Sequence, residues 1–341
     1  MSTSRGRTHR AVREAARQAA VRTLSAVPVG RWFEPRAEGQ PLRNVVVVTG
    51  PHRSGTTIMG RLLLHAPHTF LVHEPLNLDW GLVGVPQRFP YLTPSDTAHP
   101  AAQVLRRFLR TGEGQWLGHG KPLPANHQRM RTNRDNIRTL RPFGFTVIVK
   151  DPFLLLALGW ANHALSMNPI VVTLRHPCAW VASLQRRSMH PRAALESFRA
   201  QEGFGDPVVT EILARRAWEE ADLVPAGAAT WACLVRMLSV QLDAGARAEV
   251  VRMEDFAVDP YSVLLQTYRR CGLGVPRNLE RIVEEYTGAH NVVTPDQPVL
   301  HVLRRNSSAL VNAWRTRLTE DDQKVIREIT EPVATRWYDT W

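Results

Sequence analysis

Short, unbroken apolar runs alternate with longer amphipathic stretches along most of this chain. The runs are rich in valine and isoleucine, and they lie at 45–48, 69–72, 145–149, 170–174 and 249–253. Continuous apolar runs, unlike alternating ones, indicate strands that are covered on both faces, as in a parallel sheet between layers of helices. The pattern therefore predicts an α/β fold with a doubly wound parallel sheet flanked by helices.

Helices are predicted between these runs, at 55–66, 153–166, 177–187, 226–245 and 260–271. Two longer connections, roughly 77–143 and 188–226, contain Pro, Gly, Trp and Arg without clean periodicity. Connections of this length in a compact domain usually carry function. We therefore expect two long insertions on the substrate side of the sheet.

The first 40 residues differ from the rest of the chain. Arg10, Arg13 and Arg17 have helical spacing opposite a mostly alanine face, and prolines soon end the pattern. We predict a basic N-terminal arm at 1–40 and one domain at 41–341. A helix that binds a membrane surface usually carries larger apolar residues, so a solvated helix or frayed terminus is favoured over membrane contact.

Composition limits the classes of protein that fit. With 341 residues, 44% of them apolar, the chain can bury a substantial core. Its three cysteines are widely spaced and form no CxxC pair, which predicts neither a disulfide framework nor a thiolate zinc site. We found no 18-residue apolar span and no secretory signal pattern, so a cytoplasmic protein is expected.

The net charge of +12 raises the alternative of a nucleic-acid-binding protein. The excess charge lies in two segments, 1–31 and 106–141, and the rest of the chain is close to neutral. Basic charge alone is weak evidence, and the sequence has no helix-turn-helix, zinc-finger or aromatic RNA-binding signature. We therefore predict no nucleic-acid partner and keep this class as an alternative.

The stretch VVVVTGPHRSGTT at 45–57 carries the most chemistry, because an apolar strand there enters a glycine-bounded loop and then a helix. Backbone N–H groups at a helix start, with the positive end of the helix dipole, bind anions without a metal. The spacing Gly50-x4-Gly55 is that of a Walker A loop, but Thr56 stands where that loop needs lysine. A kinase or ATPase is thus disfavoured. The predicted anion-binding residues are Arg53, Ser54, Gly55, Thr56 and Thr57.

Three more polar motifs follow strands: HEP at 73–75, KDP at 150–152 and RHP at 175–177. In open α/β sheets, ligands bind beyond the carboxyl ends of the strands, so these motifs are expected to meet at one site. Asp151 is predicted to cap the helix that begins near Pro152. Glu254 and Asp255 resemble a magnesium-binding Walker B pair, but without the loop lysine we expect them to be structural.

The motifs, in this order, resemble those of sulfotransferases that use 3′-phosphoadenosine 5′-phosphosulfate (PAPS), over about residues 44–340. GPHRSGTTIMGRLL resembles the loop that binds the 5′-phosphosulfate. TLRHPCAWVASL resembles the segment that binds the 3′-phosphate, with Arg175 and Ser183 at the contacting positions. VVRMEDFAVDP and NSSALVNAWRTRLT also match the family pattern. KDPF and the acidic residue after the second strand are most similar to the branch of tyrosylprotein sulfotransferases and many bacterial enzymes.

This resemblance implies that the enzyme transfers a sulfuryl group from PAPS to an acceptor hydroxyl, with Glu74 as general base and Lys150 as electrophilic partner. Sulfuryl transfer also needs cations near the reacting oxygens, which Arg53 and Lys150 supply, and no metal is required. The planar guanidinium of Arg175 suits bidentate contact with the 3′-phosphate, and Arg304 or Arg305 is expected to close over the same phosphate. His73 remains an alternative base.

The insertions resemble nothing that assigns the acceptor. The identity of the acceptor stays open among a carbohydrate, a lipid, a small molecule and a tyrosine. The basic segment 106–141 lies between Glu74 and Lys150 in the sequence, so we expect it to border the acceptor cleft. A positive border attracts negatively charged substrates. This predicts an acceptor that carries carboxylate, phosphate or sulfate groups.

Overall fold

The computed structural model describes residues 42, 44–166, 168–201, 205–215, 218, 220–292 and 303–339. The basic arm predicted at 1–40 lies outside these residues, so its boundary with the following domain stays a prediction.

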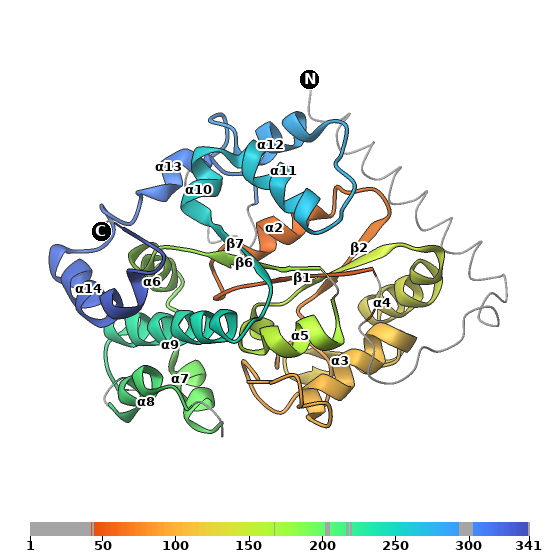
Figure 1. The fold of residues 1–341 in the computed structure, drawn as a ribbon, viewed down its shortest axis with the longest axis horizontal. Coiled ribbons are helices and arrows are strands. Elements are labelled where there is room, and N and C mark those ends of the chain that lie inside the picture. Colours follow the sequence, from red (N-terminus) through yellow and green to blue (C-terminus); the bar gives the residue numbers. More distant parts are fainter. Residues whose placement is uncertain are drawn as a thin grey trace.

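A five-stranded sheet forms the centre of the described chain (Figure 1). Its strands are β1 (Val45–Thr49), β2 (Thr69–His73), β5 (Thr146–Lys150), β6 (Ile170–Leu174) and β7 (Ala248–Arg252). Their order across the sheet is β2-β5-β1-β6-β7, and every neighbouring pair is parallel. The predicted fold class is confirmed, and each strand agrees with its predicted range to within one residue.

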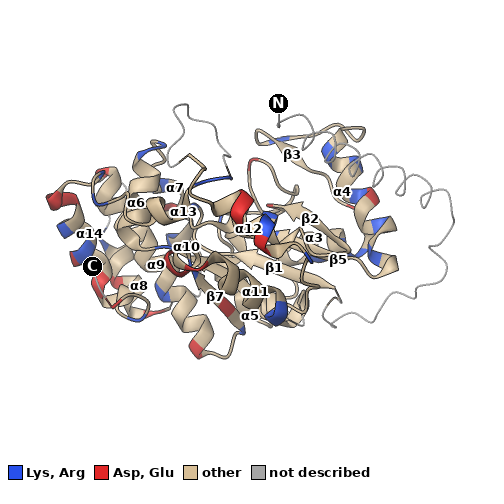
Figure 2. Ribbon diagram, turned by 90° about the horizontal axis from the view of Figure 1, so that it is seen from above, with Lys and Arg blue, Asp and Glu red and all other residues tan. Residues whose placement is uncertain are grey.

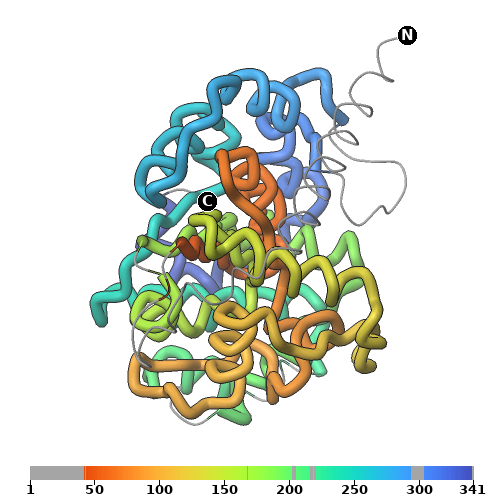
Figure 3. Tube along the Cα trace, turned by 90° about the vertical axis from the view of Figure 1, so that its right-hand side faces the viewer, coloured from red at the N-terminus to blue at the C-terminus, as the bar shows by residue number. Residues whose placement is uncertain are grey.

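Helices cover both faces of the sheet, as the unbroken apolar runs require. Val46 and Val48 of β1 pack into one core, and Val45 and Val47 pack into another on the opposite face. Figures 1 and 3 show the two helical layers on either side of the strands. The first core includes residues of α2 (Thr56–Leu63), α11 (Pro260–Arg270) and α12 (Leu279–Thr287), and the second includes α3 (Pro100–Thr111), α5 (Leu158–Ala164) and α9 (Leu223–Asp243).

A third apolar cluster joins α9 to two helices near one edge of the sheet, α6 (Pro177–Gln185) and α14 (Glu320–Ala334). Shorter elements complete the fold. They are β3 (Leu117–Gly118), β4 (Lys121–Pro122), α4 (Gln128–Thr139), the 3-10 helices η2 (Arg141–Phe143) and η3 (Pro152–Ala157), α7 (Arg192–Arg199), α8 (Pro207–Ala214), α10 (Met253–Val258) and α13 (Ser307–Val311).

The insertions are more regular than the sequence pattern indicated. The first contains α3 and α4, and the second contains α7 and α8. In α3, the buried residues Ala101, Ala102, Leu105, Phe108 and Leu109 have the spacing of one helical face. The description of 77–143 as lacking clean periodicity was therefore wrong for this stretch, which lies between proline-rich and glycine-containing segments that obscured it.

Helix α9 also corrects the sequence analysis. It has 21 residues, and its most apolar window has a mean hydropathy of 1.5, which is long and apolar enough to cross a membrane. However, 78% of that window is buried inside the protein, in contact with α6 and α14. The core helix of a globular domain meets the same length and hydropathy test, so this finding is weak evidence for a membrane span.

Candidate active site

The strand order places the predicted site residues in two groups. Strand β1 is central, and the loop 50–55 that follows it lies between the ends of β5 and β6. Lys150 ends β5 and pairs in register with His73 of β2, so Glu74 emerges beside Lys150. Arg175 follows β6 on the other side of β1. All these residues are at the carboxyl edge, where open parallel sheets bind ligands.

Two glycines shape the loop after β1. A Cβ on Gly50, where φ is 141°, would lie 2.1 Å from the carbonyl oxygen of Thr173, so only glycine lets the chain turn against β6. Gly55 has φ of 88°, and a Cβ there would lie 2.5 Å from the sulfur of Met253. Arg53 itself is left-handed, with φ of 69°. Such strain persists where the surroundings hold the loop, often at functional sites.

The helix that follows this loop begins without a cap. Gly55 is the N-cap of α2. No side chain accepts a hydrogen bond from the first N–H groups of the helix, and the first turn of the helix contains no acidic residue. Thr56 and Thr57 open the helix, and the buried hydroxyl of Ser54 has no hydrogen-bond partner in the described part of the chain. Uncapped N–H groups and an unpaired hydroxyl leave donors for an anion.

Arginines gather between this loop and α6. The Nε of Arg53 donates to Oγ of Ser183 at 3.5 Å, a contact between residues 130 positions apart. Burial lowers the pKa of Arg53 to about 10, and the positive charges of Arg187, Arg186 and Arg175 add to this effect. Within the described ranges, neither Arg53 nor Arg175 forms an ion pair with a carboxylate, although Glu254 lies within electrostatic range of the buried Arg175. Positive charge therefore accumulates around Arg53, while the charge of Arg175 is partly balanced by Glu254.

The structure favours Arg305 over Arg304 as the C-terminal cation of this group. Arg304 forms an ion pair with Glu285 of α12. Burial lowers the pKa of Arg305 to about 10, with added contributions from Arg186, Arg53, Arg175 and Arg187. Sequence analysis missed Arg186 and Arg187. Their positions three and four residues after Ser183, on one face of the helix predicted at 177–187, were a usable signal.

Glu74 and Lys150 form a buried ion pair on the other side of the loop. Lys150 is 3% exposed, the other Glu74 oxygen accepts from Asn77 Nδ2 at 2.7 Å, and the Glu74 N–H donates to the Lys150 carbonyl at 2.7 Å. Burial by itself raises the pKa of Glu74, but the charge of Lys150, then His73 and the hydrogen bonds, lower it to about 2. The predicted base, Glu74, and the predicted electrophilic partner, Lys150, are therefore paired with each other.

Asp151 fixes the backbone next to this pair. Its carboxylate accepts from Phe153 N–H at 2.9 Å, which confirms the predicted cap, and from Leu76 N–H at 2.6 Å. The second bond ties the segment after Glu74 to the end of β5. Burial, followed by the charge of Glu74, raises the pKa of Asp151 to about 7. Asp151 thus acts on the site through backbone position.

A second structural carboxylate holds the turn after β6. Glu254 accepts from His176 N–H at 3.0 Å and from the Tyr338 hydroxyl at 3.2 Å. Asp255 forms an ion pair with Arg252. The predicted structural roles of Glu254 and Asp255 are thereby confirmed. No group of three or more His, Cys, Asp or Glu side chains among the described residues is arranged to hold a metal ion.

The first insertion packs against the reaction end of this site. Nη2 of Arg129 donates to the His73 carbonyl at 2.9 Å, and its guanidinium lies over the Trp116 ring at 4.5 Å. Arg129 is also within electrostatic range of Glu74. Figure 2 shows basic residues along α4, the helix to which Arg129 belongs. Burial, then Lys150, lowers the pKa of His73 to about 4, so it is neutral at physiological pH.

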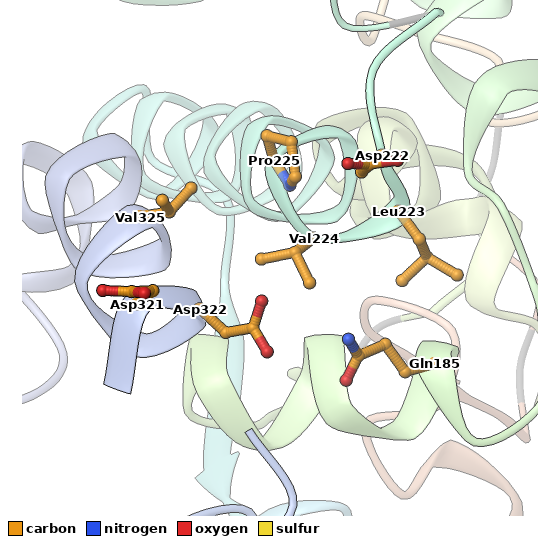
Figure 4. Close-up of a pocket in the computed structure, with 8 residues that line it drawn as sticks. All are labelled: Gln185, Asp222, Leu223, Val224, Pro225, Asp321, Asp322 and Val325. Atoms are coloured by element: carbon orange, nitrogen blue, oxygen red, sulfur yellow. The ribbon is translucent and has the colours of Figure 1, made fainter. Parts of the chain in front are cut away.

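A separate pocket of about 440 Å³ lies among α6, α9 and α14 (Figure 4). None of the predicted site residues lines it. Its walls include Gln185, Asp222, Leu223, Val224, Pro225, Asp321, Asp322 and Val325. The carboxylate of Asp322 already accepts from Thr319 N–H at 3.1 Å to cap α14. This pocket is therefore distinct from the strand-end site.

No protein-family model and no curated protein sequence matches the chain. Solved structures similar to it include a sulfotransferase domain from a Synechococcus olefin synthase, at 15% identity and TM-score 0.45, covering 91% of this chain and 100% of the other. A sulfotransferase domain from the curacin biosynthetic pathway has 12% identity and TM-score 0.47, covering 85% and 98%. A sulfotransferase from Alicyclobacillus acidocaldarius has 16% identity and TM-score 0.35, covering 83% and 99%. At these values the similarity supports no conclusion about activity.

Proposed function

We propose that the protein is a sulfotransferase that moves a sulfuryl group from PAPS to an acceptor hydroxyl. One observation carries this proposal. The uncapped start of α2 lies between two charged groups of different kinds, the arginines around Arg175 and the Glu74–Lys150 pair. PAPS has a matching distribution of charge, with an inert 3′-phosphate at one end and a reactive phosphosulfate at the other.

In this proposal, the 3′-phosphate lies against Arg175, Ser183 and Arg305, and the 5′-phosphosulfate lies on the start of α2 beside Arg53. A bond forms between the acceptor oxygen and sulfur while the bond from sulfur to the bridging phosphate oxygen breaks. The acceptor proton goes to the Glu74 carboxylate, and adenosine 3′,5′-bisphosphate leaves. Lys150 and Arg53 stabilise the negative charge that grows on the sulfuryl and bridging oxygens.

The Glu74–Lys150 pair gives donor binding a second role. While paired, Glu74 is a weak base because its pKa is held near 2. When the sulfuryl oxygens draw Lys150 away, the cause of that low pKa weakens and Glu74 becomes a stronger proton acceptor. The acceptor is then activated only after the donor has bound.

The test of this function compares ligands by thermal unfolding. Adenosine 3′,5′-bisphosphate at about one hundred times its Kd should stabilise the protein by about 3 kcal/mol, or several degrees in Tm, whereas ATP with magnesium and adenosine 5′-phosphate should shift it little. Arg175→Ala should remove most of the preference for the 3′-phosphate. Arg247→Ala is the matched control, because Arg247 lies at the opposite, amino edge of the sheet. Stabilisation by ATP, together with magnesium-dependent hydrolysis of ATP, would instead identify an ATPase or kinase.

We also propose that the acceptor is anionic. Several cations of the basic segment are already occupied, since Glu113 forms ion pairs with Arg107 and Arg138 and Asp135 with Arg134. Arg129, in contrast, lies beside the reaction centre with its guanidinium over an aromatic ring. It supplies a planar cation where the acceptor would enter.

An anionic acceptor should bind less tightly in salt. The KM of an acidic acceptor is expected to rise about tenfold between ~50 and ~300 mM salt, while the KM of a neutral analogue stays level, because screening weakens only the charged contact. Arg129→Gln should reduce this salt dependence, and Arg247→Gln should not. A flat salt profile, or equal turnover of neutral and acidic acceptors, would contradict the proposal.

A further inference from the structure

His52 is a residue of the strand-end loop to which the proposed function assigns no role. Its ring is held by aromatic neighbours, edge-on to Trp180 at 5.2 Å and tilted against Phe89 at 6.0 Å. Its carbonyl accepts the indole N–H of Trp180. Trp180 belongs to α6 and Phe89 to the first insertion, so the ring is fixed from both sides of the loop.

The ring is surrounded by the charged groups of the reaction centre. Glu74, Lys150, Arg53 and Arg88 all lie within electrostatic range of it. Burial is the main cause that lowers the pKa of His52 to about 4, and the three cations contribute further. The imidazole is therefore neutral at physiological pH, and it adds no charge to a site already crowded with cations.

The two ring nitrogens of His52 have different surroundings. Nδ1 is sealed from solvent and has no hydrogen-bond partner in the described part of the chain. Nε2 is not sealed, and no described residue bonds to it. A proton on the sealed Nδ1 would have no hydrogen-bond acceptor, so we assign the proton of the neutral ring to Nε2. His52 thus presents one N–H donor within electrostatic range of Lys150 and Arg53.

We propose that His52 donates a hydrogen bond from Nε2 to an oxygen of the sulfuryl group that is transferred. The inference rests on the proposed function and adds a contact to it. An anionic sulfuryl oxygen is the acceptor that such a donor lacks. A neutral donor stabilises it without adding to the repulsion among Arg53, Arg88 and Lys150. As the bond to the leaving phosphate breaks, the fixed N–H remains directed at the reacting group.

The test uses the difference between the donor and its product. PAPS and adenosine 3′,5′-bisphosphate differ by the sulfuryl group, so the loss of a sulfuryl contact should weaken only the first. In His52→Phe, which keeps the ring packing, the Kd of PAPS should rise about tenfold and kcat should fall about 10- to 100-fold. The Kd of adenosine 3′,5′-bisphosphate should change less than about twofold.

Two further variants complete the experiment. His52→Gln retains an N–H donor and should recover part of the PAPS affinity. His52→Leu also lacks a donor, and it replaces His52→Phe if that protein does not fold. His163→Gln changes an exposed histidine of α5 and should leave both affinities unchanged.

Two results would overturn this inference but not the proposed function. An equal rise in the Kd of both nucleotides would make His52 a structural residue of the loop. A rise in the acceptor KM alone would place His52 against the acceptor. Failure of the unaltered protein to bind either nucleotide would overturn the proposed function, and the inference with it.

Discussion

Glu74→Gln is expected to lower kcat by about 10²- to 10⁴-fold while the affinity for PAPS stays the same or increases. The loss of turnover follows from removing the proton acceptor. The retained affinity follows from the pairing of Glu74 with the Lys150 ammonium group in the free protein. In the proposed mechanism the donor has to compete with Glu74 for that group. An amide cannot hold that ammonium as strongly, so Lys150 is available to the sulfuryl oxygens.

The same substitution should destabilise the free protein. Lys150 is 3% exposed, and removing its partner leaves a buried charge without compensation, which typically costs about 3–5 kcal/mol. PAPS restores a negative partner, so the ligand-induced rise in Tm should be larger in Glu74→Gln than in the unaltered protein. A base that acts only on the acceptor, without contact to Lys150, predicts no such difference.

The measurement combines steady-state kinetics with calorimetric titration of PAPS. Glu113→Gln is the control, because Glu113 forms exposed ion pairs with arginines of the first insertion. Normal turnover in Glu74→Gln would transfer the role of base to His73, and His73→Gln would then be the inactive variant. Weakened PAPS binding in Glu74→Gln would contradict competition for Lys150.

The free energy of unfolding is expected to fall by several kcal/mol as pH drops from about 6.5 to about 4. His52, His73 and His176 have folded-state pKa values lowered to about 4 from an ordinary 6.5, and burial is the main cause for each. Between these values the unfolded chain binds protons that the folded protein does not. Stability is therefore complete above pH 6.5 and is lost as pH falls towards 4.

Buried carboxyl groups modify this profile. The lowered pKa of Glu74 acts in the same direction at lower pH, because its stabilisation is lost as pH falls from 4.5 towards 2. Asp151 acts in the opposite direction. Its raised pKa of about 7 means that its contribution is fully present below pH 3.8 and is lost as pH rises through 7. Burial also raises the pKa of Glu254, which therefore acts in the same direction as Asp151. Two opposing carboxyl groups do not outweigh three histidines, so the net change remains a loss on acidification.

Denaturant unfolding at several pH values measures this slope. His176→Asn should reduce the slope between pH 6.5 and 4, since asparagine can replace histidine as the N-cap of α6 but does not take up a proton. His163→Gln, at an exposed position, should leave the slope unchanged. Stability that stays constant or increases between pH 6.5 and 4 would show that these histidines are not buried in the folded protein.

Local patterns were sufficient to predict the strands and the glycine-bounded loop after β1. A strand covered on both faces must be apolar at every position, so runs such as 45–48 locate the sheet without any knowledge of partners. Gly50 and Gly55 reveal the loop because both have a positive φ and leave no space for a side chain. The cap formed by Asp151 is likewise local, two residues from its partner.

Only the tertiary structure decided how these parts meet. The sheet order brings together Glu74 and Lys150, 76 positions apart, and Arg53 and Ser183, 130 apart, and no local spacing encodes such contacts. The choice of Arg305 over Arg304 depends on Glu285 of α12. The neutral state of His52 depends on burial by two distant segments and on cations from others. Residue types and short spacings are properties of the sequence, whereas burial and long-range charge arise only after the chain has packed.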